Sequence, residues 1–135
     1  MSGQVVTLPG GLRVGGIWGI DHEAPNARRH IAAEIRLDRR IARKLAMQSF
    51  DVLLSHDSPR DASVLDTGSL AVTEILSLAR PAFAFYGHYH GIERLDECDY
   101  SPSEVRHLAA LDFEGRGHTA NENAVGVTRW VAGKV

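Results

Sequence analysis

The chain lacks a set of cysteines, since Cys98 is the only one, and it lacks an apolar run long enough to cross a bilayer. One cysteine excludes an internal disulfide and a zinc site built from several thiolates. A membrane span needs about 20 apolar residues, and residues 1–4 do not begin the basic and then apolar pattern of a secretory signal. These absences predict a cytoplasmic protein that does not bind a membrane.

An excess of basic residues is also missing, because 15 Lys and Arg stand against 17 Asp and Glu, a net charge of -2. The chain as a whole is therefore not expected to bind nucleic acid electrostatically. The segment from Arg28 to Lys44 nevertheless contains seven basic residues and only two acidic ones, Glu34 and Asp38. Two interpretations stay open: a solvated helix face, or a rim that attracts a phosphorylated substrate.

What the chain does contain is a series of short apolar runs that alternate with helical patterns. Extended segments are predicted at residues 5–8 and 12–20 around the turn at 9–11. Core strands are predicted at 51–55 and 82–86, because each is a short apolar run bounded by turn residues. Together these patterns predict an α/β fold with one domain that spans residues 1–135.

Two helical regions are predicted between these strands. Residues 27–49 form one long helix or two short ones, with Asn26 as N-cap. Ser69 caps a second helix, which Pro81 ends. Later strands, expected to be antiparallel, are predicted at residues 92–95, 105–111 and 124–131.

Three histidines stand where the two core strands end. His56 follows the first strand, and His88 and His90 follow the second, after Gly87. Strand ends are the usual place for an active site in an open α/β sheet, and neutral imidazole is a good ligand for transition metals. Buried histidines are also common as structural residues, so spacing alone leaves metal binding and a structural role both open. The remaining histidines have no comparable setting and are expected to be surface or structural residues: His22, His30, His107 and His118.

Residues 53–59 and 87–90 resemble the last two metal-binding motifs of the calcineurin-like metallophosphoesterases. Residues 11–20 are similar to the glycine-rich strand that precedes that half of the family's domain, and residues 124–130 to its final strand. The distance from His56 to His88 also fits. The resemblance covers nearly the whole chain but only the C-terminal half of the family's domain.

The resemblance implies a fold, a site and an activity. The fold would be the C-terminal half of a metallophosphoesterase-type αββα sandwich, with a mixed β-sheet and flanking helices. His56 and His88 would bind one metal ion and His90 the other, with Asp57 orienting its neighbour and Arg60 facing substrate. The activity would be hydrolysis of a phosphomonoester or phosphodiester, in a small molecule or a nucleotide, by metal-bound hydroxide. The cofactors would be two divalent transition metal ions (Mn, Fe, Zn or Ni), with one or none in the isolated chain.

The family's first-half motifs, including the bridging carboxylate, are absent from this sequence. Two dications with only neutral ligands would repel each other, so the chain alone is expected to be a poor catalyst or none. Three explanations stay open: the missing half is a separate chain, the sequence is a piece of a longer enzyme, or the chain is a degenerate relative that kept the fold. A half-domain exposes a sheet edge and an apolar face, so we expect association with a complementary N-terminal half or with a second copy. The alternative is a catalytically inactive binding or regulatory module on the same half-fold. A weaker alternative is a single-metal histidine enzyme of the cupin kind, for which Glu93 is the only acidic residue close after the histidines.

Overall fold

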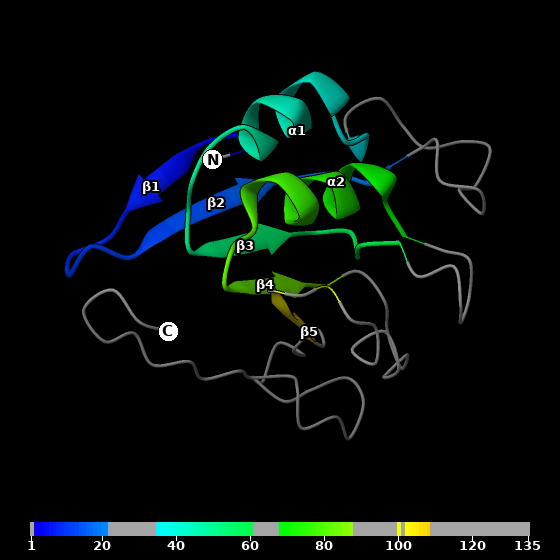
Figure 1. Cartoon of the computed structure of the whole chain (residues 1–135). Helices are drawn as coiled ribbons and strands as arrows, with labels where there is room; N and C mark the ends of the chain where they lie inside the picture. The colour runs from blue at the N-terminus through cyan, green and yellow to red at the C-terminus, as the bar shows by residue number, and fades with distance from the viewer. Residues whose placement is uncertain (1, 22–34, 61–67, 88–99, 101, 109–135) are drawn as a thin grey trace, which may run out of the picture.

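The computed structural model of the chain describes residues 2–21, 35–60, 68–87, 100 and 102–108 (Figure 1). Within these residues, one mixed sheet has the strand order β1-β2-β3-β4-β5 and carries two helices. The chain therefore has an α/β fold, as its alternating patterns predict. The predicted strands at 92–95 and 124–131 lie outside the described residues.

The first hairpin forms as predicted. β1 (Val5–Thr7) pairs antiparallel with β2 (Arg13–Ile17). The turn between them uses Gly10 and Gly11, both at φ 91°, a backbone conformation that side chains rarely adopt. Turn chemistry that is local in the sequence thus fixes this corner of the sheet.

The two predicted core strands are β3 (Val52–Ser55) and β4 (Phe83–Tyr86), and they are hydrogen-bonded neighbours. β3 is parallel to β2 and to β4. β5 (Glu104–His107) overlaps the strand predicted at residues 105–111, but it is parallel to β4, so the expected antiparallel pairing is wrong here. A parallel pair needs a connection of about a dozen residues or more, and residues 87–103 supply that length.

The helix before β3 is shorter than a single helix over residues 27–49 would be. α1 spans Arg39–Ala46, and the side chain of Asp38 caps it by accepting from the amides of Arg40 and Ile41. A continuous long helix is wrong because Arg36 forms a β-bridge with Ile20, which interrupts any helix upstream of Asp38. The predicted cap, Asn26, lies outside the described residues.

The second helix matches its prediction. α2 spans Leu70–Ala79, and the Ser69 hydroxyl accepts from the amide of Val72 at 3.1 Å. The helix ends at Arg80, which takes a left-handed conformation (φ 51°), and Pro81 follows. A capping serine and a terminating proline were therefore sufficient to locate both ends.

Both helices cover the same face of the sheet (Figure 1). Connections between parallel strands are right-handed, so a sheet whose strands follow one another in chain order receives all its helices on one side. The most deeply buried apolar side chains lie between this face and the helices: Leu45, Leu53, Val72 and Ile75. No helix in the described part of the chain is both long and apolar enough to span a membrane.

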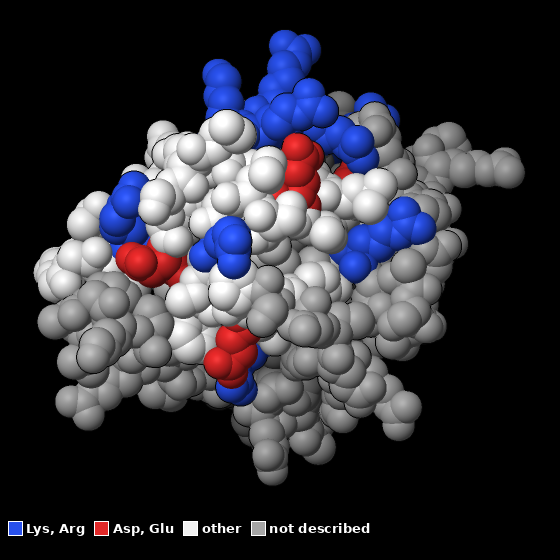
Figure 2. Space-filling model, in the orientation of Figure 1, with Lys and Arg blue, Asp and Glu red and all other residues white. Residues whose placement is uncertain are grey.

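Basic side chains gather over α1, at the top of Figure 2. Arg40, Arg43 and Lys44 are exposed on this helix. Arg39 differs from them, because its guanidinium turns inward and binds Asp21. These cations of α1 are exposed, which fits a solvated face and a substrate-attracting rim alike, so both interpretations of the basic segment stay predictions.

Candidate functional site

Four parallel strands bring their carboxyl ends to one edge of the sheet. The register pairs Ile17 of β2 with Ser55 of β3, and Ser55 with Tyr86 of β4. Residues that follow these positions in the sequence therefore leave the sheet side by side. In open α/β sheets this edge is where ligands bind.

A cavity of about 430 Å³ opens at this edge. Its lining comes from the ends of β2, β3 and β4 together with Ser2 and with Leu108, which follows β5. The volume lies within the usual range for small-molecule sites, about 300–1,000 Å³. The side chains that matter most for its chemistry are Trp18, Leu54, His56 and Phe85.

His56 lines the cavity directly after β3. Its backbone amide donates to the carbonyl of Ile17 at 3.3 Å, which continues the pairing of β2 and β3 beyond the strands. Its ring centroid lies 5.1 Å from that of Trp18, with the two planes at 49°. The imidazole is half-buried, so a group in the cavity can reach it.

His88 and His90 lie outside the described residues. The sequence places His88 two residues after Tyr86, and Gly87 between them lines the same cavity as His56. The neighbouring parallel strands on which the predicted site depends are therefore present. The convergence of the three rings on a metal ion stays a prediction.

Among the described residues, no group of three or more His, Cys, Asp and Glu side chains could hold a metal ion. This set contains only one of the three predicted ligands, His56. A half-buried imidazole at the wall of an open cavity fits a single ligand position for a transition metal. The described part of the chain thus supplies one ligand of the predicted metal centre, His56. No carboxylate that could bridge two ions is among the described residues that line the cavity.

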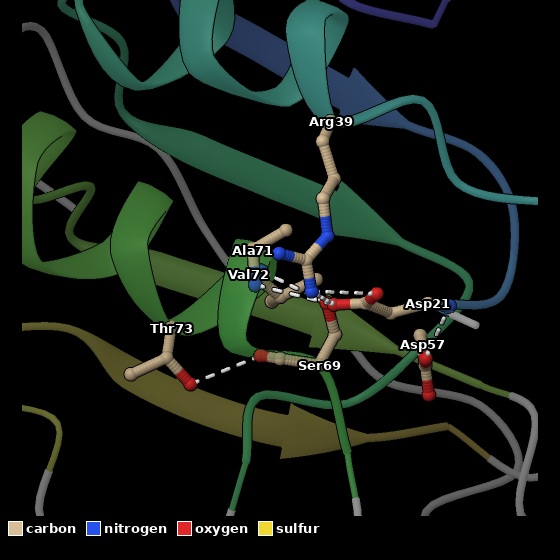
Figure 3. A network of polar contacts seen from close by, with 7 residues as sticks. All are labelled: Asp21, Arg39, Asp57, Ser69, Ala71, Val72 and Thr73. Carbon is tan, nitrogen blue, oxygen red and sulfur yellow. Dashed lines mark hydrogen bonds and ion pairs between the residues drawn. The ribbon is translucent and has the colours of Figure 1, made fainter. Parts of the chain in front are cut away.

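A network of polar contacts occupies the same edge, on the side of the helices (Figure 3). Its centre is Asp21, whose side chain is fully buried. Arg39 Nη2 donates to Asp21 Oδ1 at 3.1 Å and to Oδ2 at 3.3 Å. The Ser69 hydroxyl donates to Asp21 Oδ2 at 2.8 Å, and the amide of Ala71 donates to the same oxygen at 3.4 Å.

Asp21 therefore joins the end of β2 to the N-termini of both helices. Its negative charge meets the guanidinium of Arg39 and the amides of the first turn of α2, and both are favourable for a carboxylate. A carboxylate held in this way is a structural anchor. It is not free to bridge two metal ions.

Asp57 and Arg60 were predicted to serve the site, and the structure shows backbone contacts for both. Asp57 is buried, with Oδ2 accepting from the amide of Asp21 at 3.1 Å and Oδ1 from that of Ser58 at 3.0 Å. The amide of Arg60 donates to Thr73 Oγ1 at 2.8 Å. Neither residue is among the described residues that line the cavity. Their predicted roles toward metal and substrate stay predictions.

Two residues at this edge were not expected to matter. Asp21 follows the predicted extended segment at residues 12–20, much as His56 follows β3. Trp18 was seen only as part of a glycine-rich strand, yet its side chain is 55% exposed at the cavity. A tryptophan near the end of a predicted extended segment is visible in the sequence and could have indicated a ligand-binding edge.

Comparison of the chain with protein-family models and with curated proteins gives no match in either case.

Proposed function

We propose that this chain supplies the histidine ligands of a metal-dependent phosphoesterase, in the manner of the C-terminal half of a calcineurin-like metallophosphoesterase domain. The observation that carries the proposal is the pairing of β3 with β4. This pairing brings His56 and Gly87, the residue before His88 in the sequence, to one edge of the sheet at the ends of adjacent parallel strands. Rigid strand ends suit ligands that must hold a fixed geometry.

His56, His88 and His90 would hold divalent transition metal ions, which supply electrostatic stabilisation of the phosphoryl oxygens when bound. The chain's own contribution is to position the imidazoles. The amide of His56 is tied to the carbonyl of Ile17 at 3.3 Å, and Asp57 fixes the next turn through the amides of Asp21 and Ser58. The substrate class is a phosphomonoester or phosphodiester, in a small molecule or a nucleotide.

The proposal includes a partner. The buried carboxylate of Asp21 is engaged by Arg39 and Ser69, so it is not available to a second metal ion. No carboxylate is among the described residues that line the cavity, and in this proposal the carboxylate that bridges two ions comes from a complementary chain or from a second copy of this one. The alternative function, an inactive binding or regulatory module, follows if no such carboxylate is supplied.

The test measures metal content, mass and activity on the same preparation. The full chain is purified, its monomeric and associated forms are separated and identified by light scattering, and each is loaded with Mn²⁺. We expect the associated form to hold about two ions and to hydrolyse bis-p-nitrophenyl phosphate. His88→Ala should abolish this activity and lower the metal content.

His118→Ala is the matched control, because that histidine has no place in the proposed site, and it should keep both metal and activity. Full activity in His88→Ala would overturn the phosphoesterase proposal. Absence of bound metal from every form would also overturn it and favour the binding module.

A further inference from the structure

We propose that Trp18 is a stacking platform for substrate, and that the phosphate ester bound here carries a planar aromatic ring such as a nucleobase. This inference rests on the proposed function, since it names the substrate class of the same site. It is carried by the juxtaposition of an exposed indole, an apolar cavity and His56.

The indole of Trp18 lies where a ligand would meet it. It is 55% exposed, unusually high for so large an apolar side chain in a cavity wall. Its ring is 5.1 Å from that of His56. A ring stacked on Trp18 would therefore lie close to His56, the first proposed metal ligand.

The backbone around Trp18 is held on both sides. Its amide donates to Ser2 Oγ at 3.1 Å, and the preceding carbonyl, of Ile17, accepts from His56. The next residue, Gly19, has φ 106°, and a Cβ there would lie 2.6 Å from the backbone nitrogen of Leu37. The chain must turn at this glycine, which sets the direction in which Trp18 leaves the sheet. A platform fixed in advance loses little entropy when a ligand binds.

The rest of the cavity favours an apolar ring over a charged group. Leu54 and Phe85 are on the face of the sheet opposite the helices, and Leu54 is 42% exposed. The described lining contains no lysine or arginine. The phosphate would therefore lie toward His56, and the apolar part of the substrate would lie against Trp18.

Binding is tested first without any catalytic step. In the chain carrying Trp130→Phe, Trp18 is the only tryptophan and reports on its own surroundings. We expect saturable quenching of its fluorescence by adenosine and by adenosine monophosphate, but not by ribose 5-phosphate, which lacks the base. Calorimetry with adenosine should show affinity about tenfold weaker in Trp18→Leu and largely kept in Trp18→Phe. Met47→Ala, an exposed change away from the cavity, should bind as the unmodified chain does.

The outcomes separate this inference from the proposed function. Adenosine binding that depends on Trp18, in a chain that holds no metal, would support the platform while the phosphoesterase proposal fails. A metal-loaded chain with equal adenosine affinity in Trp18→Leu, or with no saturable quenching, would overturn the platform alone. Quenching by an aliphatic alcohol as strong as by adenosine would also overturn it, because it would show an unspecific apolar pocket.

Discussion

Leu53 and Leu54 are consecutive leucines of β3 that differ completely in burial. Leu53 is fully buried beneath the helices, whereas Leu54 is 42% exposed at the cavity. Successive side chains of a strand point to opposite faces, so the two residues sample the two sides of the sheet. On the helix side, apolar packing and the Asp21 network hold the fold together; on the other side, similar residues are left available to a ligand.

One edge of the sheet carries both structural and cavity-lining polar side chains. Asp21 and His56 both follow parallel strands and lie at the same edge. The carboxylate of Asp21 belongs to a network that joins β2, α1 and α2, whereas His56 lines the cavity. Structural polar groups and candidate functional groups thus differ in the direction of their side chains. Mutations of the first kind should lower the free energy of unfolding more than mutations of the second kind.

The largest expected effect tests the two leucines directly. Leu53→Ala should lower the free energy of unfolding by about 3 kcal/mol, because it leaves a cavity in a packed core. Leu54→Ala should lower it by less than about 1 kcal/mol, because the side chain is already part-solvated. Urea unfolding followed by circular dichroism measures both. Equal losses would show that the outer face is also part of the core.

A smaller effect is expected at the centre of the network. Asp21→Asn should cost about 2–3 kcal/mol, because the amide cannot pair with the charge of Arg39 and places a donor near Ser69 and the amide of Ala71. Asp51→Asn is the matched control, since Asp51 accepts from the amide of Arg13 at an exposed site (2.9 Å). Its cost should stay below about 1 kcal/mol. Midpoints of urea unfolding that shift equally in the two variants would contradict the assigned role of Asp21.

The smallest effect compares the caps of the two helices. Ser69 is buried and both caps α2 and donates to Asp21. Asp38 caps α1 at the surface. Ser69→Ala should therefore cost about 2 kcal/mol and Asp38→Ala about 1 kcal/mol. A thermal unfolding series on both variants checks the order, and a larger loss in Asp38→Ala would show that the network adds nothing to the cap.

Much of the fold was accessible from the sequence because it depends on neighbours along the chain. The turn at Gly10 and Gly11, the cap at Ser69 and the stop at Pro81 are local effects, and each is where the sequence predicts it. The end of β3 at Ser55, just before His56, is local in the same sense. The position of His56 at a strand end was therefore foreseeable.

Other features depend on residues far apart in the chain and were missed. Ile20 pairs with Arg36, so a single helix cannot span residues 27–49, and α1 covers only Arg39–Ala46. β5 joins β4 in parallel across a long connection. The role of Asp21 depends on Arg39 and on Ser69, 48 positions away. No periodicity or spacing in the sequence reports such contacts.

The sequence by itself determined the short strands and the caps, because apolar runs and turn residues act over a few positions. Only the tertiary structure decided which side chains are buried in the fold and which line the cavity. Burial of Asp21 against Arg39 and exposure of Trp18 beside His56 arise when separate strand ends meet at one edge. Electrostatics and packing at that edge depend on distances in space, which separation along the chain does not set.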